Sequence, residues 1–586
     1  MTYFRVWAPF AERMQVRTRI HGRQPFDTVM RREHDGWWTV EVPQADPGTD
    51  YGYLIDEATA ARPDPRSRWQ PNGVHEMSRV YDTHAYTWSD RGWTGRDLPG
   101  AVIYEMHIGT FTAEGTFDGA IGHLDHLAEL GITHVEVMPI NAVNGVWNWG
   151  YDGVGWYAVH EPLGGPDGFK RFVDACHQRG LAVVLDVVYN HFGASGNYLP
   201  EFGPYLKRVE NSWGNVVNLD GDGSPDVRRF IIENALMWLE DYHVDGLRLD
   251  AVHALVDRSK VHLVAELANE VDALRAHSAR PLILIAESDL NDPIVVTEQA
   301  GGGYGIDAQW NDDVHHALHA LLTGERQGYY VDFGTLDALA KVVTSAFLHD
   351  GTYSTILGHE HGKPVDRAAV PGYRFVACLQ DHDQVGNRAL GDRLTELVEP
   401  RLLRVGALLL LSMPFTPMLF MGEEWGAMTR WQFFTSHPEE ELGRAVRESR
   451  FVEFEDFGWN DDHRVPDPQD PQTFLLSKLD WTEPEKPGHY ELLRLYRKLI
   501  ATRHRETDLT DPRLDRVAMD RDEAARWLVL HRGALRVVAN LAVDTQVVPV
   551  GNPITDVVVA TEPGFTFDSH GLQLPAHSAA VIRVVP

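Results

Sequence analysis

Short stretches of alternating apolar and polar residues, separated by Pro, Gly and Asp, lie near both ends of the chain. A period of two residues indicates strands with one buried face, and closely spaced strands of this kind are typical of β-sandwiches. We therefore expect one β-sandwich in residues 1–90 and a second in residues 507–586. The runs that carry this prediction are residues 4–7, 36–42, 50–55, 527–531 and 535–540.

The central region, residues 91–506, has a different hydrophobic pattern, in which apolar runs of strand length alternate with stretches of helical periodicity. Repeated strand–helix units over this length favour an α/β fold with a closed (β/α)8 TIM-type barrel. Residues 405–421 are apolar, but two prolines interrupt them, so we expect a core helix and a barrel strand rather than a membrane span. The other expected strands are 102–105, 133–138, 181–187, 282–285 and 375–379, with one beginning at Val244; the other expected helices are 117–130, 167–179 and 490–504.

Two stretches of the central region follow neither period. Residues 191–226 are rich in Gly and contain several aromatic residues, and residues 324–370 form a second insertion. Long irregular loops in compact domains are usually functional or disordered. Because the first stretch follows the third predicted strand of the barrel, we expect it to cover a site.

Chemically active side chains gather in four short segments, each at or just after a predicted strand. The carboxyl ends of parallel barrel strands meet at one face, where active sites are built. We therefore expect these segments to form one convergent acidic site. The segments are residues 186–191, 246–253, 285–288 and 380–387, and their candidate residues are Asp186, Asn190, His191, Arg248, Asp250, His253, Glu287, His382 and Asp383.

The residue types in these segments suit glycoside hydrolysis, which needs two carboxyl groups in different protonation states beside one glycosidic oxygen. In an extended backbone Arg248 and Asp250 share a face, so the arginine can hold the carboxylate ionised, as a nucleophile requires. Glu287 follows an apolar run, and desolvation there would raise its pKa, which suits a proton donor. Asp383 is placed to stabilise positive charge on the sugar. Each feature has a structural alternative, namely a buried ion pair, an acid near a helix N-terminus and a turn-forming Asp.

An aromatic loop, residues 147–151, follows the second predicted strand and offers Trp147, Trp149 and Tyr151 either for stacking on a sugar or for the core. Neither a His-Glu-x-x-His pattern nor paired cysteines occur, and Arg248 would repel a cation beside Asp250, so we expect no metal and no other cofactor. A Gly-rich loop ending in Lys-Ser or Lys-Thr is also missing, which disfavours phosphate chemistry.

The formal net charge of −32 argues against nucleic acid and anionic membranes as partners, because polyanions need a basic surface. This charge is compatible with a neutral substrate such as a sugar, although acidity that only maintains solubility is the simpler explanation. The two cysteines indicate no disulfide framework, and the first residues lack the layout of a secretory signal. We therefore expect a cytoplasmic protein; the sequence does not indicate its oligomeric state.

The four segments resemble the four motif regions of the α-amylase family of glycoside hydrolases, and the resemblance spans the whole chain. Residues 4–9 are similar to the early-set immunoglobulin-like module that precedes the barrel in several members. Longer blocks are similar to those of members that release trehalose from maltooligosyltrehalose: residues 104–117, 149–154, 164–170 and 227–236.

The resemblance implies a retaining hydrolysis in which Asp250 is the nucleophile, Glu287 is the acid and then the base, and Asp383 stabilises the transition state. The bond expected to break is the α-1,4 link next to the terminal trehalose unit. A branching or debranching enzyme of the same family is the alternative, and a non-catalytic glucan-binding protein is disfavoured because all three carboxylates are present. The resemblance further implies that Arg248 orients the nucleophile and that Tyr151, Asp186, Asn190, His191 and His382 form the sugar subsite.

Two features concern specificity. We expect trehalose preference to involve the loop around Trp213 and polar groups near Asp289. Asp381 departs from the family pattern, in which Asn commonly stands before His382 and Asp383. We expect this extra acid either to shift the pH optimum or to reposition His382.

Overall fold

In the computed structural model, residues 2–211, 214–278, 280–456, 465–568 and 571–585 are described. At the centre, eight parallel strands close into a barrel in the order β12-β15-β16-β17-β20-β21-β8-β9, which confirms the predicted fold. The strands are β8 Ile103–Met106, β9 His134–Val137, β12 Ala182–Val187, β15 Gly246–Leu249, β16 Ile283–Ala286, β17 Ala308–Trp310, β20 Phe375–Cys378 and β21 Thr416–Phe420. The sequence analysis missed β17, because three residues are too few to show a period.

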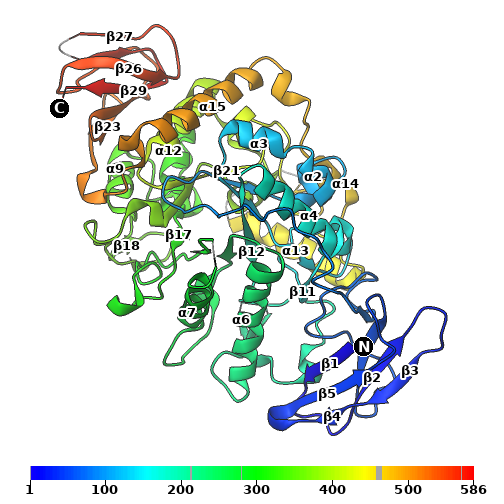
Figure 1. The fold of residues 1–586 in the computed structure, drawn as a ribbon. Coiled ribbons are helices and arrows are strands. Elements are labelled where there is room, and N and C mark those ends of the chain that lie inside the picture. Colours follow the sequence, from blue (N-terminus) through cyan, green and yellow to red (C-terminus); the bar gives the residue numbers. More distant parts are fainter. Residues whose placement is uncertain (1, 212–213, 279, 457–464, 569–570, 586) are drawn as a thin grey trace.

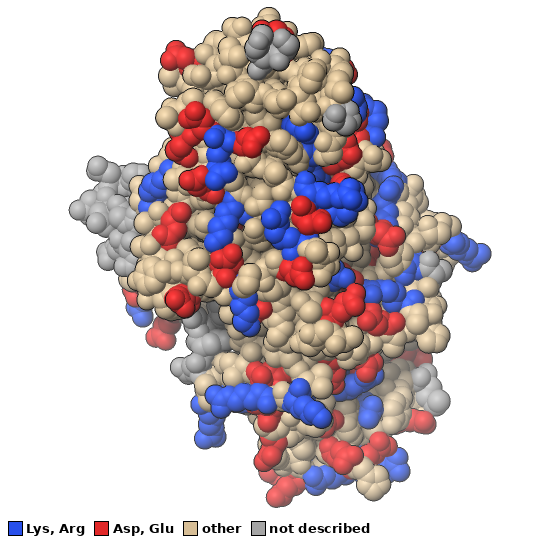
Figure 2. Space-filling view, turned by 90° about the vertical axis from the view of Figure 1, so that its left-hand side faces the viewer, with Lys and Arg blue, Asp and Glu red and all other residues tan. Residues whose placement is uncertain are grey.

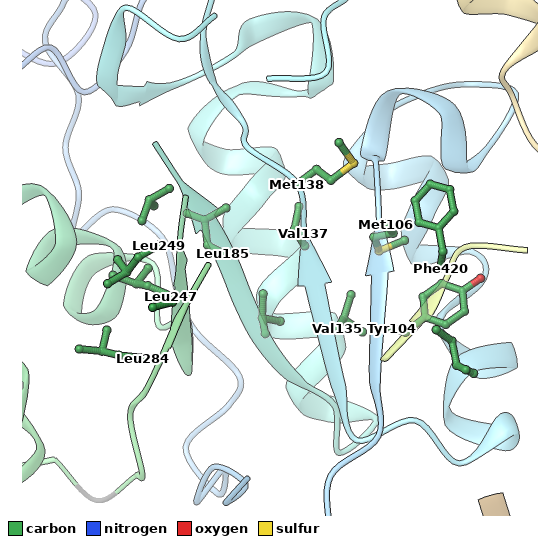
Figure 3. Packing of buried hydrophobic residues seen from close by; sticks show 14 of the residues in the cluster. Tyr104, Met106, Val135, Val137, Met138, Leu185, Leu247, Leu249, Leu284 and Phe420 are labelled. Atoms are coloured by element: carbon green, nitrogen blue, oxygen red, sulfur yellow. The ribbon is translucent and has the colours of Figure 1, made fainter. Parts of the chain in front are cut away.

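Side chains of the barrel strands alternate between two faces, and this alternation brings charge into the centre of the molecule. One set packs in the main core on the outside of the strands, as Figure 3 shows for Tyr104, Met106, Val135, Val137, Leu185, Leu247, Leu249 and Leu284. The other set, including Ile103, Val184 and Ile285, packs inside the barrel. Because the period of a strand is two, Glu105, Asp186 and Arg248 point inward with this second set.

Helices surround the barrel, as Figure 1 shows. The expected helices near residues 167–179, 405 and 490–504 are present as α4 Gly165–Gln178, α12 Pro400–Ser412 and α15 His489–Arg505. The single helix expected over residues 117–130 is wrong: α2 Phe117–Ile121 and α3 Leu124–Leu130 replace it. The break falls at Gly122, a residue that weakens a helix interior by about 1 kcal/mol relative to Ala.

The two stretches without a period contain more regular structure than expected. Within residues 191–226 lie α5 Leu199–Phe202, a hairpin of β13 Leu206–Asn211 and β14 Gly214–Val217, and the start of α6 Ser224–Asp241. Residues 324–370 contain α9 Leu336–Ser345 and a hairpin of β18 Thr352–Ser354 and β19 His359–His361. These elements are short, so their hydrophobic periods span too few residues to stand out in the sequence.

Two β-rich domains flank the barrel on opposite sides, one at each end of the chain (Figure 1). The first contains the sheets β1-β5-β4 and β3-β2-β6-β7, and the second contains β22-β23-β24-β29-β26 and β25-β28-β27. The N-terminal domain packs on the stretch after β12: Trp7 lies edge-on to Tyr205 with ring centres 5.1 Å apart, and Arg62 pairs with Glu201 at 2.7 Å. The domain limits near residues 90 and 507 stay predictions. The strand bounds of these domains are β1 Thr2–Trp7, β2 Met14–Arg19, β3 Phe26–Val29, β4 Arg31–Arg32, β5 Trp37–Val42, β6 Asp50–Ile55 and β7 Ser78–Arg79, then β22 Ala518–Asp522, β23 Trp527–Arg532, β24 Leu535–Asn540, β25 Gln546–Val548, β26 Ile554–Ala560, β27 Thr566–Phe567, β28 Leu572–Leu574 and β29 Ser578–Val584.

Charges of both signs are interspersed on the face of the molecule in Figure 2, and no continuous basic surface covers that face. In the part of the chain that the structure describes, no helix is both long and apolar enough to cross a membrane.

Candidate active site

Arg248, on the inner face of β15, joins three of the predicted acids. Its Nη1 donates to Asp186 Oδ2 and to Asp250 Oδ1, each at 2.8 Å, and its Nη2 lies 2.9 Å from Glu287 Oε2. The guanidinium is fully buried and its central carbon lies 4.3 Å from the centre of the Trp310 ring. Acids from three adjacent strands, β12, β15 and β16, therefore converge on one cation at the carboxyl ends of those strands.

Asp250, the proposed nucleophile, directly follows β15 and both of its carboxylate oxygens are held. Arg248 donates to Oδ1, and Asn190 Nδ2 donates to Oδ2 at 2.5 Å. His191 contacts the Asn190 side-chain oxygen through Nδ1, and its Nε2 lies 3.0 Å from the Tyr151 carbonyl oxygen. Burial lowers the pKa of His191 and favours its neutral form, in which one nitrogen donates and the other accepts. The predicted pairing of Arg248 with Asp250 is confirmed.

Glu287 directly follows β16, and a left-handed residue on the neighbouring strand end orients it. Ala251 has φ 40° and ψ 53°, and its N–H donates to Glu287 Oε2 at 2.8 Å. A residue with a Cβ pays roughly 1–2 kcal/mol for this backbone region, and such strain clusters at functional sites. The strained peptide and Arg248 hold the same carboxylate oxygen, so they fix where the other oxygen lies.

Tyr151 and Asp186 form the side of the site next to β12. The Tyr151 hydroxyl donates to Asp186 Oδ2 at 2.7 Å, and the Tyr151 ring stacks on the His382 ring with centres 5.1 Å apart and planes 19° apart. Burial raises the pKa of Asp186 to about 7, although Arg248 opposes the shift. The site thus presents a partly exposed aromatic face beside a carboxyl group that titrates near neutral pH.

His382 begins α10 His382–Gly386, and a buried acid that the sequence analysis did not single out holds it. Glu105 Oε1 lies 2.5 Å from His382 Nδ1, and Glu105 Oε2 accepts from the His382 backbone N–H at 2.9 Å. Burial alone would lower the pKa of His382, but the Glu105 and Asp383 carboxylates outweigh it and raise this pKa to about 10. His382 is therefore an imidazolium at neutral pH, and its Nε2 faces the site 3.6 Å from Asp383 Oδ1.

Asp383 and Asp381 flank this histidine. The Asp383 side chain is 40% exposed, and its Oδ1 accepts from Asn387 Nδ2 at 3.2 Å. Asp381 is the N-cap of α10, where its Oδ1 accepts from the Gln384 N–H at 2.7 Å. Burial and the nearby Glu105 raise the pKa of Asp381 to about 7. The residue that departs from the family pattern thus adds a second group that titrates near neutral pH, as a shifted pH optimum would require.

The remaining predicted residues have other contacts. His253 Nδ1 lies 3.2 Å from Asp289 Oδ1. Trp147 stacks on Phe474 with ring centres 5.3 Å apart, and Trp149 is buried, stacked on Trp431 and edge-on to His382 with ring centres 5.6 Å apart. Tyr151 is the ring of the aromatic loop that donates to an acid of the Arg248 network. Trp213 lies outside the described residues. Among the residues that the structure describes, no group of His, Cys, Asp and Glu side chains could hold a metal ion.

The pairing of Glu105 with His382 predicts a change in the pH dependence of stability. A histidine whose folded pKa is raised above its unfolded value stabilises the fold fully below about pH 6.5 and loses this contribution as pH rises toward 10. Glu105→Gln should remove it, so the deficit in melting temperature relative to the parent should be larger at pH 6 than at pH 9.5. Thermal unfolding across this range measures the deficit, and a deficit independent of pH would contradict the proposed charge state.

A closed (β/α)8 barrel that presents these carboxylates at its strand ends defines a glycoside hydrolase of the α-amylase type. The sequence model "Alpha amylase, catalytic domain" matches residues 77–213, "Carbohydrate-binding module 48 (Isoamylase N-terminal domain)" matches residues 1–70, and "Domain of unknown function (DUF3459)" matches residues 512–581. These matches accord with the three-part fold.

Full-length relatives show to which family of α-amylase-type glycoside hydrolases the chain belongs. The chain is 54% identical to the malto-oligosyltrehalose trehalohydrolase of Arthrobacter ramosus, over 99% of both chains. It is 30% identical to the 1,4-alpha-glucan branching enzyme of Bacillus caldolyticus, over 74% of this chain and 66% of that one. The crystal structure of a putative alpha amylase from Salmonella typhimurium has a TM-score of 0.90 at 38% identity and covers 100% of this chain and 97% of that one. The chain belongs to the malto-oligosyltrehalose trehalohydrolase family.

Proposed function

We propose that the protein hydrolyses the α-1,4-glucosidic bond next to the terminal trehalose of maltooligosyltrehalose, releasing trehalose and a maltooligosaccharide with retention of configuration. The observation that carries the chemistry is the single guanidinium of Arg248, which binds both Asp250 and Glu287. Because the Arg248 guanidinium contacts both side chains, it holds the two carboxyl groups close together. A retaining glycosidase requires this, since its two carboxyl groups are about 5–5.5 Å apart. The name of the full-length relative supplies the substrate.

In the first step, an Asp250 oxygen attacks the anomeric carbon while Glu287 gives its proton to the departing glycosidic oxygen. The bond to trehalose breaks as the bond to Asp250 forms, and the transition state carries positive charge on the sugar ring. The Asp383 carboxylate, which is the most exposed of the three, stabilises that charge. In the second step Glu287 takes a proton from water, and the hydroxide displaces Asp250 from the same carbon.

The surrounding residues hold the sugar that is attacked. Tyr151 offers its ring to the apolar face of this sugar, and the His382 Nε2–H donates to a hydroxyl. Asp186, bound to Tyr151 and Arg248, accepts from another hydroxyl and keeps the arginine in place. Asn190 and His191 act mainly by fixing the nucleophile and the Tyr151 loop, because their side chains contact those groups.

The direct test is to incubate the purified protein with maltotriosyltrehalose and, separately, with amylose and glycogen. We expect equal amounts of trehalose and maltotriose from the first, and ¹H NMR should show the α-anomer of maltotriose before mutarotation. The β-anomer appearing first would exclude retention. Absence of trehalose, combined with new α-1,6 branches in amylose, would instead establish the branching alternative.

We also propose α-glucan oligosaccharides as partners and the cytoplasm as the compartment. Both cysteines are free and buried, which is typical of a protein that folds under reducing conditions. Cell fractionation with an antibody against the chain tests the compartment.

A further inference from the structure

Asp312 is a fourth carboxyl group at the carboxyl ends of the barrel strands, and it comes from the strand that the sequence analysis missed. It is the first residue of α8 Asp312–Thr323, two residues after β17 ends. In the barrel, β17 lies between β16, which Glu287 follows, and β20, which leads to Asp383. The fold therefore places Asp312 between the proposed proton donor and the transition-state stabiliser.

The Asp312 carboxyl differs from its neighbours in its contacts with the protein. Asp186, Asp250 and Glu287 all accept hydrogen bonds or ion pairs from other side chains or the backbone. Within the described residues, no hydrogen bond or ion pair holds the Asp312 side chain, which is partly exposed. Burial, together with the charges of Asp381, Glu287 and Asp383, raises its pKa well above the ordinary value. A partly exposed carboxyl whose pKa is raised and which those residues do not engage can accept from a sugar hydroxyl and, when protonated, also donate to one.

One helical turn further on, α8 carries a second group that suits a sugar. His316 lies four residues after Asp312 and so on the same side of the helix. Its ring stacks on Tyr329, with centres 4.8 Å apart and planes 27° apart, and burial lowers the pKa of His316 to about 3. Both rings are partly exposed. Burial, with a smaller contribution from Asp383, raises the pKa of Tyr329 to about 12. The stacked pair lies in the segment between β17 and β20, the strand that leads to Asp383.

These residues lie across the barrel from Tyr151, because β17 and β9, the strand before the Tyr151 loop, are four strands apart in the ring of eight. Tyr151, Asp186 and Asn190 come from β12 and the loop after β9, whereas Asp312, His316 and Tyr329 come from the segment between β17 and β20. Glu287 lies between the two groups, and a proton donor must face the departing oxygen. The departing sugar therefore extends toward α8, where the partly exposed Asp312 carboxyl group and the stacked rings meet it.

We propose that Asp312, His316 and Tyr329 form the surface that binds the departing trehalose unit, with Asp312 hydrogen-bonded to hydroxyls of the first departing glucose. This inference rests on the proposed function and deepens it, since it identifies the residues that recognise the departing trehalose unit. It differs from the expectation that polar groups near Asp289 carry trehalose preference, and variants of Asp312 and of Asp289 distinguish the two.

The test compares two substrates that differ only in the departing group. Cleavage of maltotriosyltrehalose releases trehalose as the departing group. Cleavage of 2-chloro-4-nitrophenyl α-maltotrioside releases a phenolate, which has no sugar hydroxyls. Asp312→Ala should lower kcat/KM for the first about 10- to 100-fold, the effect of losing hydrogen bonds to a carboxyl group. For the aryl glycoside it should stay within about twofold, because catalysis itself does not use Asp312. His316→Ala should show the same contrast.

Control variants distinguish failure of this inference from failure of the proposed function. Asp312→Asn, which is isosteric, replaces Asp312→Ala if the latter fails to fold, and thermal unfolding checks both. Asp289→Asn should leave both substrates unchanged. Equal losses on both substrates, or no loss on either, would overturn the inference while leaving the proposed function intact. A parent protein that releases no trehalose would refute the proposed function itself, and an Asp289→Asn variant that alone loses the trehalosyl substrate would move the binding surface to the loop after β16.

Discussion

Asp250→Asn should lower kcat on maltotriosyltrehalose by on the order of 10⁴-fold or more, while the protein keeps its fold. The amide has no charge with which to attack the anomeric carbon, yet its carbonyl oxygen can still accept from Arg248, which now donates at 2.8 Å. Volume changes little, so packing is preserved. Steady-state release of trehalose measures the loss, and circular dichroism with thermal unfolding measures the fold.

A matched control lies on the same strand. Asp245 precedes β15 at the opposite, amino end of the barrel, where it is fully buried, contacts His177 at 2.9 Å and pairs with Arg280 at 3.2 Å. A buried charge at that face serves stability rather than catalysis. Asp245→Asn should therefore lower the melting temperature and leave kcat within about threefold of the parent. If the two variants were equally active, Asp250 would be an ordinary buried ion-pair partner and the nucleophile would lie elsewhere.

Much of the barrel and its central pairings could be predicted from local sequence patterns. Apolar runs of strand length located seven of the eight barrel strands, and β17 escaped because it has three residues. Arg248 and Asp250 are two residues apart, so an extended backbone is enough to predict their contact. The contact of Arg248 with Asp186 needs only that their strands be neighbours, and the two residues are indeed paired in register.

Contacts that depend on closure of the barrel could not be predicted in this way. Glu105 and His382 are 277 residues apart in sequence, and they meet because the first and last strands, β8 and β21, pair and close the ring beside β20. The left-handed backbone of Ala251 gives no sequence signal, because residues with that geometry are usually Gly or Asn. The aromatic loop was ambiguous for a related reason: whether a ring faces substrate or core depends on distant partners such as Phe474 and Trp431.

Asp312 could not be recognised as a site residue from the sequence, because the strand before it, β17, was missed. An acid at the start of a helix is common for electrostatic reasons, since it interacts favourably with the helix dipole. Only the placement of β17 between β16 and β20 makes this acid part of the site. The four sequence segments thus identify the groups proposed to break the bond, whereas the groups proposed to bind the departing sugar follow β17, a strand too short to be recognised.

Arg248→Met should have the largest effect on stability, a loss of about 3–5 kcal/mol at neutral pH, together with loss of activity. The variant keeps the length of the side chain but leaves Asp186, Asp250 and Glu287 in the barrel without their shared cation. Without its counter-ion the buried Asp186 is favoured in its protonated form, so its folded pKa rises further. Asp186 has a pKa of about 7 even with the arginine present.

The raised pKa of Asp186 sets the direction in which the stability loss of Arg248→Met changes with pH. A carboxyl whose folded pKa lies above its unfolded value of about 4 destabilises the fold increasingly as pH rises from 4 through the folded pKa. Arg248→Met should therefore be nearer to the parent at pH 5 than at pH 8, and urea unfolding at both values measures the difference. Arg179→Met provides the control, because Arg179 pairs with the largely exposed Asp125 and such surface pairs contribute about 0–1 kcal/mol. A variant as stable as the parent at pH 8 would show that the barrel tolerates three unpaired acids, and that Arg248 does not hold them in their charged forms.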